Sequence, residues 1–379
     1  MMRVLHINAG NLFGGVETLL ITLARFRALT PEVEPEFALC FDGPFSAELK
    51  SIGVPVVALG ETRVRNPLSV ISARRRLAAL IEREHYDVVV CHMAWAHAIF
   101  GPVVRASGVP LVEWQHLASD GSHWLERWSR WSPADLVICN SRFTADRLPD
   151  SLRGGSVEVV YCPVAQPRTY SEADRLAARD EFETPADAVV IVLASRMQEW
   201  KGHRLLLEAA REILGVSNWI VWIVGGPQRD FESRYCDGLR EMASASGIAD
   251  RVRFVGERRD VDRILAAADI HCQPNITPEP FGIAFIEALY ARLPVVTTAI
   301  GGAVEIVDDS CGLLVPPADP AALAWALSRL ITDGALRKRL GASGPRRAHQ
   351  LCGPELQMTR LSGIFQALGN AESARAVRA

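Results

Sequence analysis

Two successive runs of alternating strand-like and helical segments restrict the fold of this sequence more than any other feature. In the first run, strand-like segments alternate with helical ones predicted over Val16–Ala28 and Leu68–Glu84. The predicted strands are Val4–Asn8, Glu36–Phe41, Val54–Leu59, Val88–Cys91, Leu111–Trp114 and Leu136–Cys139. Alternation of this kind predicts a parallel sheet with helices on both faces.

The same alternation restarts near Ser171, which predicts a second, similar α/β domain. Its predicted strands are Val189–Ala194, Ile220–Val224, Val252–Val255, Ile270–Gln273 and Pro294–Thr298, and closing helices are predicted over Pro320–Thr332, Ala335–Leu351 and Pro354–Leu368. A chain of 379 residues also exceeds what one hydrophobic core usually serves. We therefore expect domains over 1–161 and 171–355, with a hinge at 162–170 and a closing helical segment, 356–379, with a frayed tail after Ala371.

Composition excludes several classes of protein. A hydrophobic fraction of 49% and a net charge of -3 lack the basic signature of a nucleic-acid partner. The eight cysteines lie far apart without a Cys-x2-Cys pair, which favours buried thiols over disulfides or zinc. The N-terminal apolar run is too short for a signal peptide, and no run approaches ~20 apolar residues, so we expect a cytoplasmic protein.

The stretch from Thr277 to Glu287 carries the strongest chemical signal. After two prolines and Gly282, a helix is predicted from Ile283, and it is apolar through Ala291 apart from Glu287. Burying an unpaired carboxylate costs several kcal/mol, so Glu287 needs donors, for which ligand hydroxyl groups are one candidate. We expect Ile283, Glu287 and Tyr290 to face a cleft. The free amides of residues 281–283 suit a phosphate at the helix N-terminus.

This Glu-x7-Glu arrangement, with Pro-Phe-Gly after the first Glu, resembles the signature of the retaining family 4 glycosyltransferases. The resemblance implies the GT-B fold, in which two Rossmann-like, doubly wound parallel-sheet domains face each other across a cleft. It also implies that the C-terminal helix, 356–379, packs back on the first domain. It also implies that Glu279 contacts the donor sugar and that Glu287 holds the nucleotide ribose. The amides of Phe281, Gly282 and Ile283 would then meet sugar hydroxyls and phosphate.

Ligands of open α/β sheets bind at the carboxyl ends of the strands, so the loops there are informative. The first strand is followed by a glycine turn, residues 10–17, that opens a helix and can approach phosphate closely, although such turns are common. It resembles the family's Gly-Gly-x-Glu element, which implies that Gly15 lies against the donor phosphate. His116 follows another predicted strand, where a histidine more often caps or packs, but the resemblance implies that it contacts the donor sugar in the catalytic centre.

In the second domain, Arg196 ends a strand and Lys201 precedes the next helix. Such a pair can converge on one diphosphate, although two surface cations are the usual outcome. The resemblance implies that both grip the donor diphosphate. It places the nucleotide base near 224–226 and 255–258, and it extends to the glycine turn at 299–305 and the strand at 312–315. The hinge departs from the family pattern, because Tyr161–Ala165 replaces an Asn-Gly-Val-Asp element.

Three tryptophans, Trp124, Trp128 and Trp131, share one predicted helical face near Arg127 and Arg130. Either this face packs on its own sheet, or it forms a platform for the acceptor or an interfacial face for a lipid-linked acceptor. The second alternative would bring peripheral contact with the inner face of the membrane. Three consecutive arginines, residues 74–76, are interpreted as a solvated helix face.

The sequence therefore predicts an enzyme, a retaining hexosyltransferase-type glycosyltransferase. The first domain would bind a glycan or lipid-linked acceptor, and the second a nucleotide-sugar donor, with the base, UDP or GDP, unresolved. His116, Glu279, Arg196 and Lys201 are the predicted catalytic residues. We expect no cofactor and no metal, and we interpret Asp260 and Asp262 as helix-capping residues despite their Asp-x-Asp pattern.

Three alternatives to this assignment remain. A glycoside hydrolase could use Glu279 and Glu287 as a carboxylate pair, but it needs no diphosphate clamp. A nicotinamide-dependent oxidoreductase would carry Gly-x-Gly-x-x-Gly, which is absent. A nucleotide-sugar-binding protein without activity is the non-enzymatic alternative, and only turnover distinguishes it from an enzyme.

Overall fold

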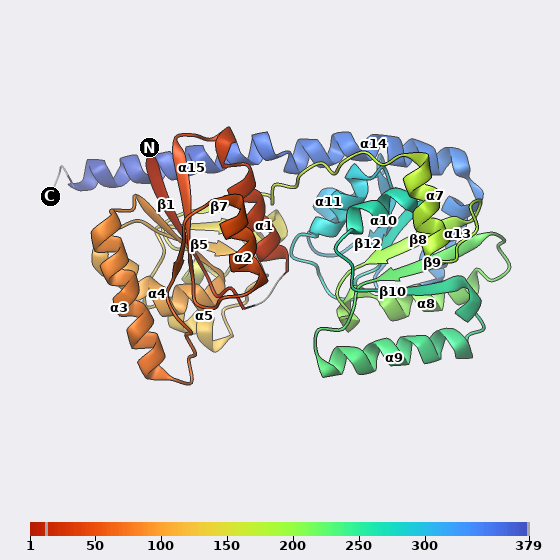
Figure 1. Ribbon diagram of the computed structural model, residues 1–379, viewed down its shortest axis with the longest axis horizontal. Helices are drawn as coiled ribbons and strands as arrows, with labels where there is room; N and C mark the ends of the chain where they lie inside the picture. The colour runs from red at the N-terminus through yellow and green to blue at the C-terminus, as the bar shows by residue number, and fades with distance from the viewer. Residues whose placement is uncertain (12–13, 377–379) are drawn as a thin grey trace. The chain divides into compact units, whose positions relative to one another are not determined.

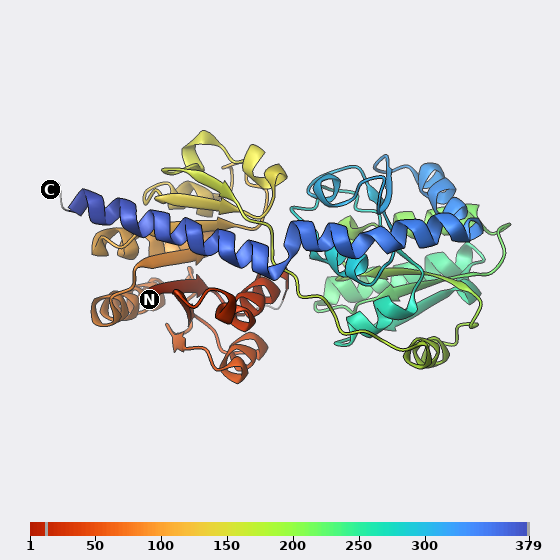
Figure 2. The ribbon, with the colours of Figure 1, turned by 90° about the horizontal axis from the view of Figure 1, so that it is seen from above.

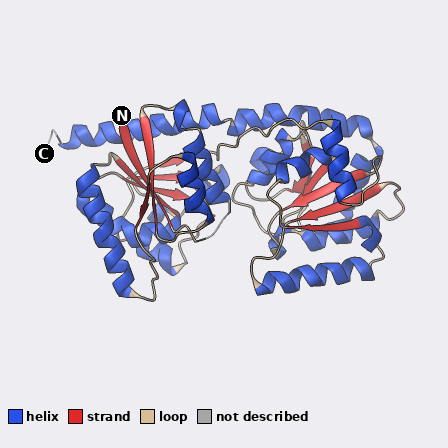
Figure 3. Ribbon diagram, viewed as in Figure 1, coloured by secondary structure: helices blue, strands red, loops and turns tan. Residues whose placement is uncertain are grey.

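The strands of the described residues lie in two parallel sheets, as the sequence predicts (Figure 1, Figure 3). The computed structural model describes residues 1–11 and 14–376, with side chains through Asn370. It divides into a first unit, Met1–Ala165 with Cys352–Ala379, and a second unit, Gln166–Leu351. Among the described residues, no helix has the length and hydropathy needed to cross a bilayer.

The first unit contains a seven-stranded sheet in the order β3-β2-β1-β4-β5-β6-β7. Its strands are β1 (Met2–Asn8), β2 (Val33–Leu39), β3 (Val56–Ala58), β4 (Val88–His92), β5 (Leu111–Gln115), β6 (Leu136–Cys139) and β7 (Val157–Val159). Its helices are α1 (Gly15–Arg25), α2 (Pro44–Ile52), α3 (Pro67–Glu84), α4 (Met93–Ser107), α5 (Trp124–Ser129), α6 (Arg142–Asp146) and α15 (Pro354–Ala376), with 3-10 turns η1 (Arg27–Leu29) and η2 (Asp150–Leu152).

The second unit contains a six-stranded sheet in the order β10-β9-β8-β11-β12-β13. Its strands are β8 (Val189–Ala194), β9 (Trp219–Val224), β10 (Val252–Gly256), β11 (Ile270–Gln273), β12 (Val295–Thr298) and β13 (Gly312–Val315). Its helices are α7 (Glu172–Glu181), α8 (His203–Glu212), α9 (Asp230–Ala245), α10 (Val261–Ala267), α11 (Ile283–Tyr290), α12 (Ala303–Ile306), α13 (Pro320–Thr332) and α14 (Gly334–Cys352), with 3-10 turns η3 (Glu199–Lys201) and η4 (Ala249–Arg251).

Local sequence explains where several helices begin. Asn66 accepts a hydrogen bond from the Ser69 amide at the start of α3, where Pro67 occupies a position that needs no amide donor. Asp319 caps α13 in the same way through the amide of Ala322. These caps satisfy amides that have no acceptor within their own helix.

The two faces of the first sheet differ in character. Leu5, Ile7, Val89 and Cys91 pack with α3 and α4 in a hydrophobic core. The intervening residues of β1 and β4 point to the other face, where side chains of α1 and α15 surround His6. Figure 2 shows α15 running across this sheet. The eight cysteines are all buried and free, which confirms the prediction of buried thiols.

The structure corrects several predicted boundaries. Strand β3 is shorter than the predicted 54–59, since only three residues pair with β2, and β7 adds an edge strand that the sequence pattern did not indicate. Helix α15 does not end near Leu368 but continues to Ala376. Residues 369–376 carry no apolar periodicity, so the sequence pattern gives no signal for this last part of the helix.

Candidate active site

Glu279 lies in a polar cluster at the carboxyl edge of the second sheet. Its Oε2 atom accepts a hydrogen bond from Lys201 Nζ at 2.5 Å, and the Glu279 residue is buried. The two side chains come from different elements, Lys201 from η3 after β8 and Glu279 from the loop after β11. Because β8 and β11 are parallel neighbours, their carboxyl ends bring these loops together.

Gln273 and Asn275 complete the cluster, and sequence analysis did not find them. Their side-chain amides each lie 3.3 Å from Glu279 Oε2, and they lie 3.0 Å from each other. The hydroxyls of Thr297 and Thr298 bond the carbonyls of Gln273 and Asn275, at 2.8 and 2.6 Å. The only available signal was the change from apolar to polar residues where β11 ends.

Two glycines allow this close packing of loops. Gly202, directly after Lys201, has φ +81°, and a Cβ atom there would lie 1.9 Å from the carbonyl oxygen of Pro274. Gly301 has φ +68°, and its Cβ would lie 2.4 Å from the carbonyl oxygen of Glu279. Any side chain at either position would push the loops of Lys201 or Glu279 apart.

Arg196 supplies a second cation beside the cluster. Its side chain is exposed and makes no hydrogen bond or ion pair within residues 1–11 and 14–376. Burial lowers the pKa of Lys201, Glu279 opposes this effect, and the positive charge of Arg196 adds to the lowering. Both residues lie in the segment that follows β8, so both cations belong to the carboxyl edge of the second sheet.

Helix α11 begins beside Glu279, after Gly282 in the left-handed region at φ +109°. The first-turn amides of a helix have no acceptor within it. Of the predicted phosphate-binding residues, Ile283 is the first of the helix and Gly282 is its N-cap, whereas Phe281 precedes the helix. Ile283 and Glu287 are partly exposed on this helix. Tyr290, expected on the same open face, is instead buried, because α11 packs along most of its circumference.

Glu287 is a partly buried carboxylate without a hydrogen-bond partner among the described side chains and backbone groups. Burial, followed by the negative charge of Asp262, raises its pKa to about 7. The described residues therefore offer this carboxylate no donor, which leaves it able to accept hydroxyl donors from a ligand.

Asp260 and Asp262 have roles that the sequence only partly predicted. Asp260 is the N-cap residue of α10, but its side chain makes no capping hydrogen bond. It pairs instead with Arg258 at 2.8 Å and Arg263 at 3.3 Å, which holds its pKa well below the usual range. Asp262 accepts a hydrogen bond from the Tyr170 hydroxyl at 2.6 Å. The predicted capping bond is wrong because the arginines compete more strongly for the carboxylate.

The remaining predicted residues, Gly15 and His116, lie in the first unit. Gly15 is the exposed first residue of α1; the preceding turn includes Leu12 and Phe13, which lie outside the described residues. His116 directly follows β5 and is buried. Burial lowers its pKa to about 3, so the ring is neutral at physiological pH. His116 can thus offer a neutral hydrogen-bonding nitrogen but not a positive charge.

The tryptophans do not form the single buried helical face that was one alternative. Helix α5 ends at Ser129, so Trp131 lies beyond it and is 85% exposed. Trp124 is half exposed and stacks on Trp128, with ring centroids 6.1 Å apart. The guanidinium of Arg74 lies over Trp128 and bonds the carbonyl of Ile99, so it is not part of a solvated face as predicted.

Two parallel α/β sheets, with a paired lysine and glutamate and a helix N-terminus at one carboxyl edge, define the GT-B class of glycosyltransferases. Residues 13–166 match the family described as Glycosyltransferase Family 4, and residues 174–347 match Glycosyl transferases group 1. The chain belongs to the family 4 glycosyltransferases, which confirms the resemblance seen in the sequence.

Individual relatives agree with this assignment. The D-inositol 3-phosphate glycosyltransferase of Nocardioides sp. is 32% identical over 350 residues, covering 83% of this chain and 74% of the relative. The lipopolysaccharide core biosynthesis glycosyltransferase LpsE of Rhizobium meliloti is 30% identical over 75% of this chain and 77% of its own length. The D-inositol 3-phosphate glycosyltransferase of Streptomyces avermitilis is 35% identical over 57% of this chain. The match spans about half, 48%, of the length of that relative.

Solved structures share the fold at lower identity. Anabaena HepE in complex with UDP has a TM-score of 0.84 and 22% identity, covering 97% of this chain and all of the HepE chain. The glycosyltransferase WaaG of lipopolysaccharide biosynthesis has a TM-score of 0.68 and 17% identity, covering 96% of this chain and 99% of WaaG. These structures support the two-domain GT-B architecture.

Proposed function

We propose that this protein transfers a hexose from a nucleotide diphosphate donor to an acceptor hydroxyl with retention of anomeric configuration. The observation that carries the proposal is the juxtaposition of Lys201, Glu279 and the N-terminus of α11, with Arg196 beside them. Cations and helix amides suit a diphosphate, and buried carboxylates and amides suit sugar hydroxyls.

Leaving-group stabilisation is the main catalytic contribution in this proposal. An ammonium has three N–H donors, and Glu279 occupies one donor of Lys201, which leaves two for phosphate oxygens. Arg196 and the amides of Gly282 and Ile283 supply further donors. One preorganised donor at a developing negative charge can contribute about 3 kcal/mol, so the protein needs no metal ion and no cofactor for this step.

Glu279 and His116 would orient the donor sugar, and Glu287 would hold the ribose hydroxyls. Gly15 would lie against the phosphate. The departing phosphate oxygen would accept the proton of the acceptor hydroxyl, so the reaction would need neither a protein base nor a covalent intermediate. The raised pKa of Glu287 supports the ribose assignment, because hydroxyl donors would satisfy a carboxylate that the protein leaves bare.

The acceptor would bind the first unit. Exposed Trp124 and Trp131 offer aromatic surfaces that suit a sugar ring or the interface of a membrane that holds a lipid-linked acceptor. The relatives named for D-inositol 3-phosphate and lipopolysaccharide core glycosylation make both a soluble and a lipid-linked hydroxyl acceptor reasonable candidates. HepE was solved with UDP-glucose, which makes UDP-glucose the first donor to test.

The test is direct. The protein is incubated with UDP-glucose or a GDP-hexose and a panel of hydroxyl acceptors, and nucleotide diphosphate release is measured together with the anomeric configuration of the product by NMR. Retention and acceptor-dependent release are the expected results. An inverted product would overturn the retaining mechanism.

The same assay separates the alternatives. A glycoside hydrolase would cleave a glycan in water without nucleotide. A binding protein without activity would bind nucleotide, detected as a rise in thermal stability, but release no product. A ligand present at about a hundred times its Kd should add about 2.7 kcal/mol of stability.

A further inference from the structure

Three histidines from three neighbouring strands form one buried hydrogen-bond chain in the first unit. His6 Nδ1 lies 3.0 Å from His92 Nε2, and His92 Nδ1 lies 3.0 Å from His116 Nε2. His6 is in β1, His92 ends β4 and His116 follows β5, and each residue is at most 6% exposed. The chain therefore connects the proposed sugar-orienting residue, His116, with the interior of the sheet face beneath α15.

The surroundings hold the rings in register. The rings of His92 and His116 are nearly parallel, at 15°, with centroids 5.3 Å apart, as an in-plane hydrogen bond requires. The ring of Trp114 is nearly parallel to both, and His6 lies against Phe37 with centroids 5.4 Å apart. Helix α4 begins immediately after His92, and Met93 adopts φ +68° at the junction. A left-handed conformation is uncommon for a residue with a side chain, so the backbone maintains an unfavourable turn that fixes His92.

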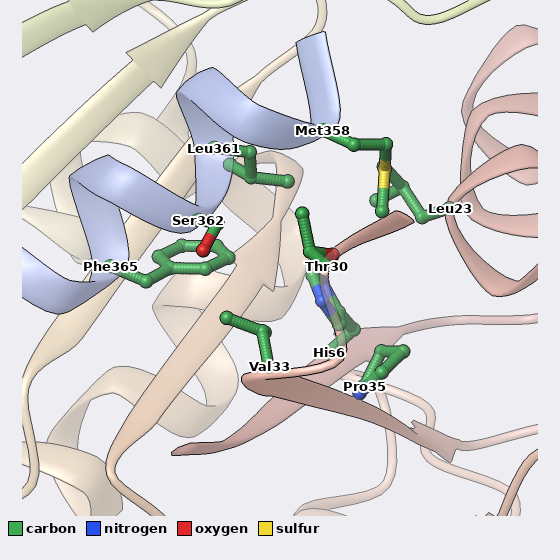
Figure 4. Close-up of a pocket in the computed structure, with 9 residues that line it drawn as sticks. All are labelled: His6, Leu23, Thr30, Val33, Pro35, Met358, Leu361, Ser362 and Phe365. Atoms are coloured by element: carbon green, nitrogen blue, oxygen red, sulfur yellow. The ribbon is translucent and has the colours of Figure 1, made fainter. Parts of the chain in front are cut away.

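The inner end of the chain opens on a small cavity. Figure 4 shows His6 with Leu23, Thr30 and Val33 and with Met358, Leu361, Ser362 and Phe365 of α15 around it. The cavity has a volume of about 20 Å³, enough for about one water molecule. Neither His6 Nε2 nor His116 Nδ1, the two outer nitrogens of the chain, bonds any group in the described parts of the protein.

Hydrogen-bond geometry restricts the protons in this chain. A neutral imidazole carries one N–H, so each link joins a donor on one ring to an acceptor on the next. Both links form only when all three rings carry the proton on the same nitrogen. Either all are Nδ1–H, and His116 Nδ1 donates outward, or all are Nε2–H, and His116 Nδ1 accepts. Burial lowers the pKa of all three rings, so they stay neutral near pH 7.

We propose that His6 and His92 are positioning residues that lock the tautomer of His116 to their own, so that all three rings carry the proton on the same nitrogen. The tautomer determines whether His116 Nδ1 donates to or accepts from a ligand hydroxyl. The consequence of this locking for catalysis rests on the proposed function, in which His116 contacts the donor sugar. The locking itself is a property of the protein without any ligand.

Histidine-selective nitrogen-15 NMR of the unliganded protein tests the locking, since nitrogen shifts distinguish Nδ1–H from Nε2–H. In the wild-type protein His6, His92 and His116 should share one tautomer. His92→Phe preserves a stacking ring but removes both hydrogen bonds, and His6→Phe removes only the inner link. In His92→Phe the Nδ1–H fraction of His116 should change and no longer match that of His6, whereas in His6→Phe His92 and His116 should still show equal fractions.

A matched control separates hydrogen bonding from packing. Phe37→Leu disturbs the ring that stacks on His6 but leaves both links of the chain intact, so the His116 tautomer should be unchanged. If His92→Phe does not fold, His6→Phe still tests the proposal, since His92 and His116 should keep equal Nδ1–H fractions there. Unequal fractions at the three histidines in the wild type, or at His92 and His116 in His6→Phe, would overturn it.

Kinetics then test the consequence for transfer. His92→Phe should lower kcat about tenfold or more while the KM for the donor stays within about twofold, as for other partners that fix a catalytic histidine. His92→Asn, which can restore a bond to His116 Nε2, should recover part of this loss. A wild-type protein without transferase activity would refute the proposed function but not the locking, which NMR measures without donor.

Discussion

At the scale of single residues, Arg196 and Lys201 share a proposed role but differ in burial and in pairing. Lys201 is largely buried and paired with Glu279, whereas Arg196 is exposed. We predict that Arg196→Ala and Lys201→Ala each lower transfer at least about a hundredfold, because each removes charge stabilisation from the leaving diphosphate. Initial rates at saturating donor measure this effect.

The exposed cations Lys338 and Arg339 of α14 provide the matched controls, since they lie away from the sheet edge that carries Lys201. Their alanine variants should retain near-normal rates. Near-normal turnover by both Arg196→Ala and Lys201→Ala would show that the diphosphate does not bind at this edge of the sheet. Circular dichroism of Lys201→Ala checks that loss of the Glu279 pair has not unfolded the loop.

Glu287 gives a prediction for ligand binding. If its carboxylate holds the ribose, Glu287→Gln should weaken nucleotide diphosphate binding but leave the affinity for free sugar unchanged, since only the nucleotide touches it. Isothermal titration calorimetry with both ligands measures the difference. Unchanged nucleotide affinity would show that Glu287 does not bind the ribose.

The same substitution gives a prediction for stability with a defined sign. The pKa of Glu287 rises from 4.5 to about 7 in the folded protein, so the folded state binds more protons between these values and the wild type loses stability as pH rises through about 7. Glu287→Gln removes this loss. The free energy of unfolding of Glu287→Gln minus that of the wild type, measured by urea unfolding, should therefore increase between about pH 5 and about pH 8. A constant difference would show that burial does not perturb Glu287.

At the scale of elements, α10 allows a test of metal independence. Asp262 is bonded to Tyr170, and Asp260 is paired with Arg258 and Arg263, so each carboxylate of the Asp-x-Asp pattern has a protein partner. We predict that transfer survives excess EDTA and that Asp262→Asn leaves the rate within a few fold, because the amide still bonds Tyr170. Loss of activity in EDTA with rescue by Mg²⁺ or Mn²⁺ would contradict both expectations.

At the scale of the whole molecule, the proposed phosphate contacts lie on both units, Gly15 on the first and Arg196 with Lys201 on the second. A ligand that bonds both should draw them together about the segment 162–170. We predict that saturating nucleotide diphosphate lowers the radius of gyration in small-angle X-ray scattering. Lys201→Ala under the same conditions is the control, since its weakened binding should reduce the compaction.

The sequence by itself determined the α/β class, the two parallel sheets and the family. These properties follow from apolar segments at strand and helix spacing and from short motifs, which depend only on neighbouring residues. The buried cysteines could be predicted for the same reason. Boundaries such as the end of α15 could not, because residues 369–376 carry no apolar periodicity.

Only the tertiary structure decided which distant side chains meet. Gln273 and Asn275 are ordinary polar residues until the parallel pairing of β8, β11 and β12 brings them to Glu279 and Lys201. His6 and His92 likewise carry no motif, and they join His116 because β1, β4 and β5 are neighbours in the sheet. Strand order is set by packing across the whole chain, so hydrogen bonds between non-consecutive strands lie beyond local sequence patterns.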